Sequence, residues 1–401
     1  MRVLFLTHRL PYAPNRGDRL RAYHILQWLR DRASVELVSL VHDDEEAAHV
    51  EEVRAFVPRV TALRVRAFRN HLRAIATLTT DVPLTHALLD ASGIASTLNE
   101  IVAARRPDVV FAYGSGMGRL ALAPPLSGLP FVLDLVDVDS RKWQDMSVSS
   151  GWPLSWIYSR EARTLGAFEA RAATAAVATL VVNEREAEIA RKLAPRANVQ
   201  VLANGVELER LRPVSAASDR PRVVFCGVMN YAPNEQGMRW FINGAWPIIK
   251  RHRPDATLAV VGADPPRSFE ALCATDQTIE VTGRVPDVRP WLWESAVGIA
   301  PLQVARGVQN KALEAIAAGL PIVITPAVAE GLPEEAAPAV TVAGLPEEFA
   351  EHVVALLSMS PQARRSRAAL ANLSGLHWGN TLSPLGKLLE IAATSQKPSE
   401  L

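Results

Sequence analysis

Residues 210–227 read RLRPVSAASDRPRVVFCG, and this stretch decides the fold. Its first part, 210–222, is polar and contains prolines, a composition typical of linkers. Its second part, Val223–Cys226, is a short apolar run that ends at Gly227, which is the pattern of a buried strand before a turn. The stretch therefore predicts a linker after which a new series of strands begins.

Short apolar runs alternate with helical stretches on both sides of this linker. Before it, the predicted strands are 3–6, 35–41, 109–112, 131–138, 180–183 and 199–203; after it, they are 223–226, 257–261, 279–282, 298–301 and 321–325. Strands that alternate with helices form parallel, doubly wound sheets. We therefore expect an α/β protein with two Rossmann-like domains, 1–209 and 223–375, joined by the linker 210–222 and followed by a helix over 376–393.

The composition excludes several classes of protein. The 43 Lys and Arg residues nearly balance the 42 Asp and Glu residues, and a net charge of +1 gives no basic excess for general nucleic-acid binding. Two cysteines cannot make a disulfide framework and indicate a reducing compartment. Since no apolar stretch has the length of a signal peptide core or a bilayer span, the sequence predicts a soluble, cytoplasmic protein.

The strongest candidate site begins with Arg306-Gly307-Val308-Gln309-Asn310-Lys311-Ala312-Leu313-Glu314, which follows a strand and opens an apolar helix. In open α/β sheets, ligands bind beyond the carboxyl ends of the strands. A helix start offers unpaired N–H groups and the positive end of the helix dipole, and with Arg306 and Lys311 beside it this segment could hold a diphosphate. Glu314, one turn further on, could accept hydrogen bonds from ribose hydroxyls. The alternative is a solvated surface turn.

Three carboxylates, Asp134, Asp137 and Asp139, lie in the strand predicted at 131–138 or directly after it. They could bind a divalent metal through oxygen ligands, position a hydroxyl group, or act as a base. Ser140 after Asp139 would also suit a helix cap, so a purely structural role stays open.

Other loops carry weaker signals. Gly17 lies in the loop after the first strand, where no G-x-G-x-x-G motif occurs, and its backbone could pass close to a ligand. Arg284 and Val285 follow the strand predicted at 279–282, and their backbone could face a nucleobase. Each of these loops could equally be an ordinary turn. Asn204-Gly205 predicts a turn with positive φ, and the histidines show no metal-binding spacing.

Several of these segments resemble one family. Thr282-Gly283-Arg284-Val285-Pro286-Asp287 and residues 305–323, ARGVQNKALEAIAAGLPIV, are similar to the C-terminal domain of GT-B glycosyltransferases of family 4. Residues 7–24, THRLPYAPNRGDRLRAYH, and 132–143, VLDLVDVDSRKW, resemble the sugar transferases associated with PEP-CTERM/exosortase exopolysaccharide loci. The resemblance covers most of the chain.

This resemblance implies two domains that face each other across a cleft and a retaining hexosyltransferase. It would move a sugar from a nucleotide-sugar donor to a glycan or lipid-linked acceptor in exopolysaccharide biosynthesis. No cofactor and no metal are expected. The predicted donor-binding residues are Gly17, Gly227, Arg284, Val285, Arg306, Gly307, Gln309, Asn310, Lys311 and Glu314, and the predicted catalytic residues are Asp137, Asp139 and Arg306.

The sequence departs from the family pattern at two places. Of the family's two donor-site glutamates, the second matches Glu314 but the first falls on Arg306, and residues 227–234 lack the cations that often hold the diphosphate. We infer that Arg306 and Lys311 take over that charge. A nucleotide-sugar 2-epimerase of the same fold, with Asp137 or Asp139 as its acid or base, and a non-catalytic donor-binding subunit are the alternatives.

Residues 58–76 form a basic and amphipathic segment. Arginines at 59, 64, 66, 69 and 73 occur without an acidic residue, and Phe68, Leu72 and Ile75 have helical spacing. Such a helix could lie on an anionic membrane surface, which would place the protein at the inner face of the membrane. Alternatively, the apolar stripe could pack into the first domain.

Overall fold

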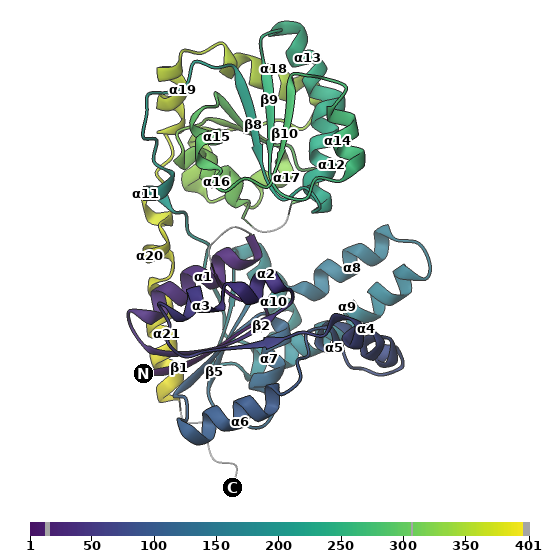
Figure 1. Ribbon diagram of the computed structural model, residues 1–401, viewed down its shortest axis with the longest axis vertical. Coiled ribbons are helices and arrows are strands. Elements are labelled where there is room, and N and C mark those ends of the chain that lie inside the picture. The colour runs from purple at the N-terminus through teal and green to yellow at the C-terminus, as the bar shows by residue number, and fades with distance from the viewer. Residues whose placement is uncertain (13–16, 306–307, 396–401) are drawn as a thin grey trace. The chain divides into compact units, whose positions relative to one another are not determined.

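The computed structural model describes residues 1–12, 17–305 and 308–395. The chain divides into two compact units (Figure 1). The first comprises Met1–Ala203 and the C-terminal segment from Leu382, and the second comprises Asn204–Thr381. Each unit has its own sheet of parallel strands, which confirms the α/β class with two Rossmann-like domains. In the described ranges no helix combines the length and apolar character needed to cross a bilayer.

The first unit contains a seven-stranded sheet in the order β3-β2-β1-β4-β5-β6-β7. Its strands are β1 (Arg2–Thr7), β2 (Ser34–Val41), β3 (Val60–Arg64), β4 (Val109–Tyr113), β5 (Phe131–Val136), β6 (Ala178–Val181) and β7 (Val199–Val201). Successive residues of β1 and β4 are buried, as expected where helices cover both faces of a parallel sheet. Because β1 lies between β2 and β4, its carboxyl end is the topological switch point.

The helices of the first unit connect these strands. They are α1 (Gly17–Arg30), α2 (Asp44–Ala48), α3 (Val50–Arg54), α4 (Ala67–Ala76), η1 (Thr77–Thr79), α5 (Leu84–Leu88), α6 (Ile94–Ala104), α7 (Ser115–Ala121), α8 (Asp139–Ser149), α9 (Leu154–Ala175), α10 (Glu184–Leu193) and α21 (Ser383–Thr394). The helices α8 and α9 form a hairpin that projects from the sheet (Figure 1). Trp143 of α8 contacts Tyr158 of α9, with 5.3 Å between ring centres.

The second unit contains a six-stranded sheet in the order β10-β9-β8-β11-β12-β13. Its strands are β8 (Arg222–Cys226), β9 (Thr257–Val261), β10 (Ile279–Gly283), β11 (Val297–Ala300), β12 (Ile322–Ile324) and β13 (Val340–Val342). Its helices are α11 (Leu208–Leu211), α12 (Ala232–Trp240), η2 (Phe241–Ala245), α13 (Trp246–His252), α14 (Arg267–Cys273), α15 (Arg289–Trp293), α16 (Asn310–Ala317), α17 (Pro326–Ala329), η3 (Glu334–Ala339), α18 (Pro346–Leu357), α19 (Pro361–Ala368), η4 (Leu373–Leu376) and α20 (Trp378–Thr381).

The end of the chain differs from the prediction of one helix over 376–393. The segment forms two helices, α20 and α21, and Pro384 lies in the first turn of α21. Proline is tolerated there because the first N–H groups of a helix have no partner within it, but proline does not continue a helix from the preceding turn. α21 contacts β4 and β5 of the first unit. Its Gly386 lies against Trp28, which an added Cβ would approach to 3.0 Å.

Specific contacts determine the conformation of the linker 210–222 and of the turn at 204–205. The linker predicted at 210–222 is fixed to the second unit, since Ser218 Oγ donates to the carbonyl of Glu294 at 2.9 Å and Arg364 donates to the carbonyl of Ser218 at 2.6 Å. The prediction of positive φ at Asn204-Gly205 is wrong. A glycine is needed at 205 because an added Cβ would lie 2.6 Å from the Cα atom of Trp378.

Candidate functional site

The switch point of the first sheet carries a histidine. His8 directly follows β1, and its ring stacks on Tyr113 at the end of β4 with 5.6 Å between ring centres. Gly114 has φ of 85°, and an added Cβ would lie 3.2 Å from His8 Nδ1, so both conformation and space favour glycine there. The spacing of the histidines, which shows no metal-binding pattern, gave no indication of His8. Its position directly after the first strand is the signal that could have found it.

Asp134, the first of the three carboxylates at β5, is held by an ion pair. Arg21 of α1 donates from Nε to Asp134 Oδ2 at 2.8 Å, and both side chains are buried. Arg21 Nη1 also donates to the carbonyl of Leu202 at 2.6 Å. This network ties α1 to the sheet, and the arginine stabilises the carboxylate in the interior.

The backbone bends sharply between Asp134 and Asp137. Val136 has φ of 67°, which is a strained value for a β-branched residue, and the pairing of β5 with β6 shifts register at this point. The N–H of Asp137 then donates to the carbonyl of Leu135 at 2.9 Å in a tight turn. Strained backbone of this kind clusters at functional sites, which supports the selection of Asp137 as a candidate residue.

Asp139 begins α8 and lies among further carboxylates. Ser140 does not cap this helix, because Val138 is the N-cap residue and the Ser140 hydroxyl instead donates to Glu169 of α9. Burial, with a smaller contribution from the charge of Asp139, raises the pKa of Glu169 to about 8, and the hydrogen bond from Ser140 acts in the opposite direction. Burial likewise raises the pKa of Glu186, again with a contribution from nearby aspartates.

Asp137 and Asp139 therefore share one environment with Glu169 and Glu186, which the sequence analysis missed. Both glutamates lie in helices without a recognisable motif, so only the folded structure shows them. A carboxyl group with a pKa near neutrality can exchange a proton at working pH. In the described ranges, 1–12, 17–305 and 308–395, no group of three or more His, Cys, Asp or Glu side chains is arranged to hold a metal ion.

Glycine-containing loops meet at the carboxyl ends of β8, β9 and β10. The N–H of Gly227 donates to the carbonyl of Val261 at 2.9 Å, and the N–H of Gly262 donates to that of Gly283 at 3.2 Å. A Cβ on Gly262 would lie 1.8 Å from the carbonyl oxygen of Gly227, so no side chain fits there. Backbone atoms of these loops, and not side chains, therefore lie at the carboxyl edge of the sheet. Gly227 was predicted to contact the donor at this edge.

Lys311 and Glu314 of α16 lie beside these loops. Lys311 Nζ donates to Asn234 Oδ1 at 2.5 Å and lies 4.9 Å from the ring centre of Phe225. Burial lowers the pKa of Lys311 to about 8, while the charge of Glu314 acts in the opposite direction. Burial raises the pKa of Glu314, and Lys311 opposes that shift. The two side chains are therefore coupled across one turn of the helix.

The remaining predicted donor residues are placed as follows. Gln309 is the N-cap residue of α16, and Asn310 has a buried Oδ1 atom without a hydrogen-bond partner among the described residues. Arg284 is exposed, and Val285 is partly buried and packs against the core of the second unit. Gly17 begins α1. Arg306 and Gly307 lie outside the described residues, and all these assignments stay predictions.

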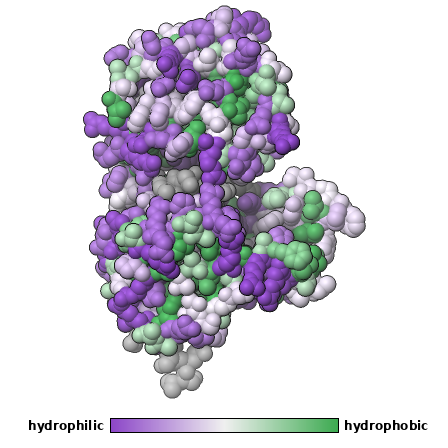
Figure 2. Space-filling model, in the orientation of Figure 1, coloured by the Kyte–Doolittle hydropathy of each residue, from purple (hydrophilic) through white to green (hydrophobic). Residues whose placement is uncertain are grey.

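The helix α4 turns its apolar stripe outward. Phe68, Leu72 and Ile75 are 81%, 55% and 64% exposed, so the alternative that the stripe packs into the first domain is wrong. The side toward the protein carries Asn70, whose amide donates to the carbonyls of Leu88 and Asp90 at 2.9 and 2.7 Å. Figure 2 shows hydrophobic surface on the lobe that carries α4, α8 and α9.

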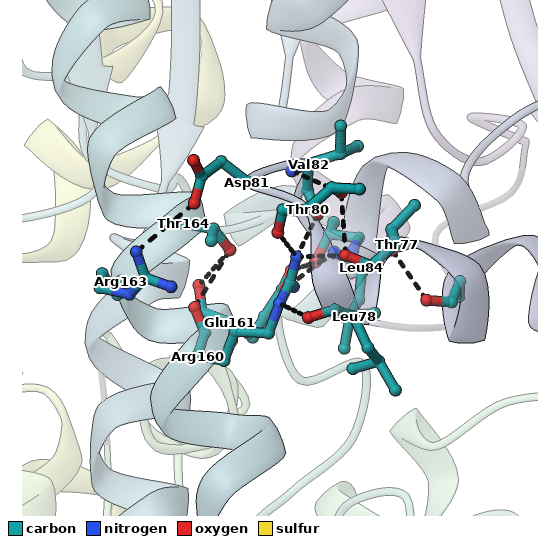
Figure 3. Close-up of polar contacts among 12 residues, drawn as sticks. Thr77, Leu78, Thr80, Asp81, Val82, Leu84, Arg160, Glu161, Arg163 and Thr164 are labelled. Carbon is teal, nitrogen blue, oxygen red and sulfur yellow. Dashed lines mark hydrogen bonds and ion pairs between the residues drawn. The ribbon is translucent and has the colours of Figure 1, made fainter.

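A buried arginine holds the chain after α4 against α9. Arg160 donates from Nε to the carbonyl of Leu78 at 3.0 Å and from Nη2 to the carbonyls of Thr77, Thr80 and Val82 (Figure 3). The neighbouring Glu161 accepts hydrogen bonds from the N–H groups of Leu84 and Thr85 at 2.6 and 2.9 Å. These bonds fix the orientation of α4 relative to the α8–α9 hairpin.

Comparison with known proteins agrees with this architecture. Residues 17–205 match the glycosyl transferase 4-like domain, and residues 220–359 match glycosyl transferases group 1. The comparison with curated proteins gave no match.

Among solved structures, HepE of Anabaena in complex with UDP and glucose is 14% identical, with a TM-score of 0.68, over 98% of this chain and 100% of that one. Sucrose-phosphate synthase from Thermosynechococcus elongatus is 15% identical, with a TM-score of 0.70 and the same coverage. WaaG, a glycosyltransferase involved in lipopolysaccharide biosynthesis, is 18% identical, with a TM-score of 0.59, over 99% of this chain and 100% of that one.

The two matched domains and the two Rossmann-like units define a glycosyltransferase with the GT-B fold. The matched segments fall one in each unit, so both halves of the fold are represented in the chain.

Proposed function

We propose that the protein transfers a hexosyl group, with retention of configuration, from a nucleotide-sugar donor to a glycan or lipid-linked acceptor. The observation that carries the proposal is the coupled pair Lys311 and Glu314 at the carboxyl edge of a sheet whose unit matches group 1 glycosyl transferases. HepE is described with UDP and with UDP-glucose, which supports a nucleotide sugar as the donor.

Lys311 has a chemical role in this reaction. Departure of a nucleoside diphosphate develops negative charge on the leaving oxygen, and a fixed cation stabilises that charge in the transition state. With a pKa of about 8, the Lys311 amine is mostly protonated at pH 7. Its bond to Asn234 brings it to residues 227–234, the segment that lacks a cation of its own. This supports the inference that Lys311, with Arg306, supplies the missing charge.

On the acceptor side, Asp137 and Asp139 are the residues proposed to position the acceptor hydroxyl and accept its proton. The strained turn at Val136 and the neighbouring Glu186, whose pKa burial raises, support that choice. The reaction is proposed to need no metal, since cations and backbone N–H groups carry the charge of the leaving group. The resemblance of residues 7–24 and 132–143 to exosortase-associated transferases supports a role in exopolysaccharide biosynthesis.

We also propose that the exposed stripe of α4 places the protein on the inner face of the membrane. Phe68, Leu72 and Ile75 would enter the interface, and Arg66 and Arg69 would meet anionic headgroups, each contributing about 1 kcal/mol. Vesicles that contain phosphatidylglycerol should co-sediment the protein, and phosphatidylcholine vesicles should not. Changing the arginines at 64, 66, 69 and 73 to Gln should abolish binding; unchanged binding would contradict the idea. Val214→Ser, at an exposed apolar residue of the second unit, is the control.

A turnover assay with a panel of nucleotide sugars tests the main proposal. The transferase should release nucleotide only when an acceptor fraction is added, and the sugar should appear in the acceptor with the anomeric configuration of the donor. An epimerase would convert the nucleotide sugar without any acceptor. A non-catalytic donor-binding subunit would bind the nucleotide sugar and turn over none.

A further inference from the structure

A wide groove of about 960 Å³ runs between α8, α9 and α10 of the first unit. Its floor is formed by small residues of α9, namely Ala162, Gly166 and Ala167. An added Cβ on Gly166 would lie 3.4 Å from Ser140, so a larger residue there would close the space between α9 and the start of α8. The groove lies within one unit, and none of the predicted donor residues that the structure describes lines it.

Cationic side chains line the walls of this groove. All the charged side chains among the described lining residues are arginine or lysine, and there are five: Arg141, Arg160, Arg163, Arg185 and Lys192. Arg141 and Arg163 pair only with exposed carboxylates, at 3.3 Å from Asp145 and 3.5 Å from Asp81, and such pairs contribute little.

One of these cations is well placed to bind an anion. Lys192 has no ion-pair partner among the described residues. Arg160 contributes to the wall but is 95% buried, its Nε and Nη2 atoms donate to backbone carbonyls, and its Nη1 atom lies 3.6 Å from Glu161 Oε2. A concave surface of one charge sign concentrates ligands of the opposite sign.

The same groove has an apolar side. Leu78, Trp156, Ile189 and Leu193 contribute to its lining, and Trp156 is 53% exposed. Trp156 lies on the first turns of α9, close in sequence to the exposed Trp152 and Leu154 of the hairpin. A ligand in the groove would therefore meet both cations and a hydrophobic surface that continues to the projecting end of the hairpin.

The other end of the groove reaches the predicted acceptor side. Val138 and Ser140 line it, and they are the immediate neighbours of Asp137 and Asp139 in the chain. We infer that the groove binds the acceptor as an amphipathic organic phosphate, with its phosphate groups on the cations and its apolar portion along Trp156. The inference rests on the proposed transferase function and names the substrate class of its acceptor.

Binding of a soluble isoprenoid diphosphate tests the inference without turnover. The probe is farnesyl diphosphate, titrated calorimetrically into the full chain in the absence of membranes. It should bind more tightly than inorganic pyrophosphate, which lacks the apolar portion, and than farnesol, which lacks the phosphates. The double variant Arg141→Gln/Lys192→Gln should weaken farnesyl diphosphate binding about tenfold or more, because each removed cation loses a charge-assisted bond. Arg191→Gln, on α10 but outside the groove lining, is the matched control and should leave it unchanged.

Three results would overturn the inference. Farnesyl diphosphate could fail to bind, the control and the double variant could lose the same farnesyl diphosphate affinity, or the protein could bind phosphatidylglycerol vesicles and not farnesyl diphosphate. The last result would assign the cations to bulk lipid headgroups. UDP binding to the same variants should stay at the level of the unchanged protein, because the predicted donor residues within the described ranges do not line the groove. If UDP binding and acceptor-dependent turnover persist while farnesyl diphosphate fails to bind, the groove assignment falls and the transferase proposal stands.

Discussion

Replacing Lys311 by Met separates a binding role from a structural one. The folded protein lowers the pKa of Lys311 from 10.5 to about 8, so the charged amine is disfavoured in the fold. The unfolded chain binds its proton up to higher pH, and stability therefore rises as pH increases from about 8 to about 10.5. Below pH 8 the full penalty is present, at most roughly 3 kcal/mol by the size of the shift. Lys311→Met removes this penalty.

The same change removes the bond to Asn234 and the cation beside the leaving group. Loss of a hydrogen bond to a charged group costs about 1.5–3 kcal/mol, which offsets most of the gain, so the free energy of unfolding should change by no more than about 1.5 kcal/mol. For donor affinity, no gain offsets the loss of the Lys311 amine. If the amine contacts the diphosphate, the Kd for UDP should rise between about tenfold and about 150-fold.

The assay is calorimetric titration with UDP at pH values from below 7 to above 9, combined with denaturant unfolding of the unliganded protein. Affinity of the unchanged protein should fall as pH passes through 8, and affinity of Lys311→Met should not follow that curve. Lys250→Met is the control, since Lys250 donates to the carbonyl of Ala256, just before β9, at the amino edge of the same sheet. Unchanged UDP affinity in Lys311→Met, together with a loss of stability above about 2 kcal/mol, would refute the proposed role and leave a structural lysine.

The other predictions concern the remaining site residues and the first unit. Glu314→Ala and Arg306→Ala should each weaken UDP-sugar binding by about 1.5–3 kcal/mol, and unchanged affinity in Arg306→Ala would remove the charge-replacement idea. Turnover should persist in EDTA; loss that Mg²⁺ or Mn²⁺ restores would show that the carboxylates after β5 bind metal. Arg21→Met should cost about 3–5 kcal/mol of stability because it leaves Asp134 buried without its cation, as measured by denaturant unfolding. A loss below about 1 kcal/mol would contradict the view that Arg21 is what stabilises the buried Asp134 carboxylate.

The sequence was sufficient for the interior of both sheets and for one edge strand of each, β7 and β10, but not for the other edge strand. Central strands such as 3–6 and 223–226 are continuous apolar runs because both of their faces are buried. The strands β3 and β13 were missed, and each is an edge strand of its sheet. Edge strands bury less side-chain area, and these two read VTALR and VTV, so neither forms a long apolar run.

Only part of the candidate site could be predicted from the sequence. Lys311 and Glu314 could be predicted because they lie one turn apart on a helix that follows a strand. The hydrogen bond from Lys311 to Asn234 could not be predicted, because it joins side chains 77 positions apart. Glu169 and Glu186 were missed for the same reason: their pKa values are raised by burial beside α8, which depends on how three helices pack together.

The helix α4 shows a limit of periodicity itself. A stripe at helical spacing establishes that one side of a helix is apolar, but not that this side faces the core. Here the inner side carries Asn70 and Ala74, and hydrogen bonds from Asn70 and Arg160 hold the segment in place. Full burial of a large apolar side chain would contribute about 1.5–3 kcal/mol, and Phe68, Leu72 and Ile75 forgo most of that in the isolated chain. A surface that covered this stripe would recover that free energy without any rearrangement of α4, because the bonds from Arg160 already fix its orientation.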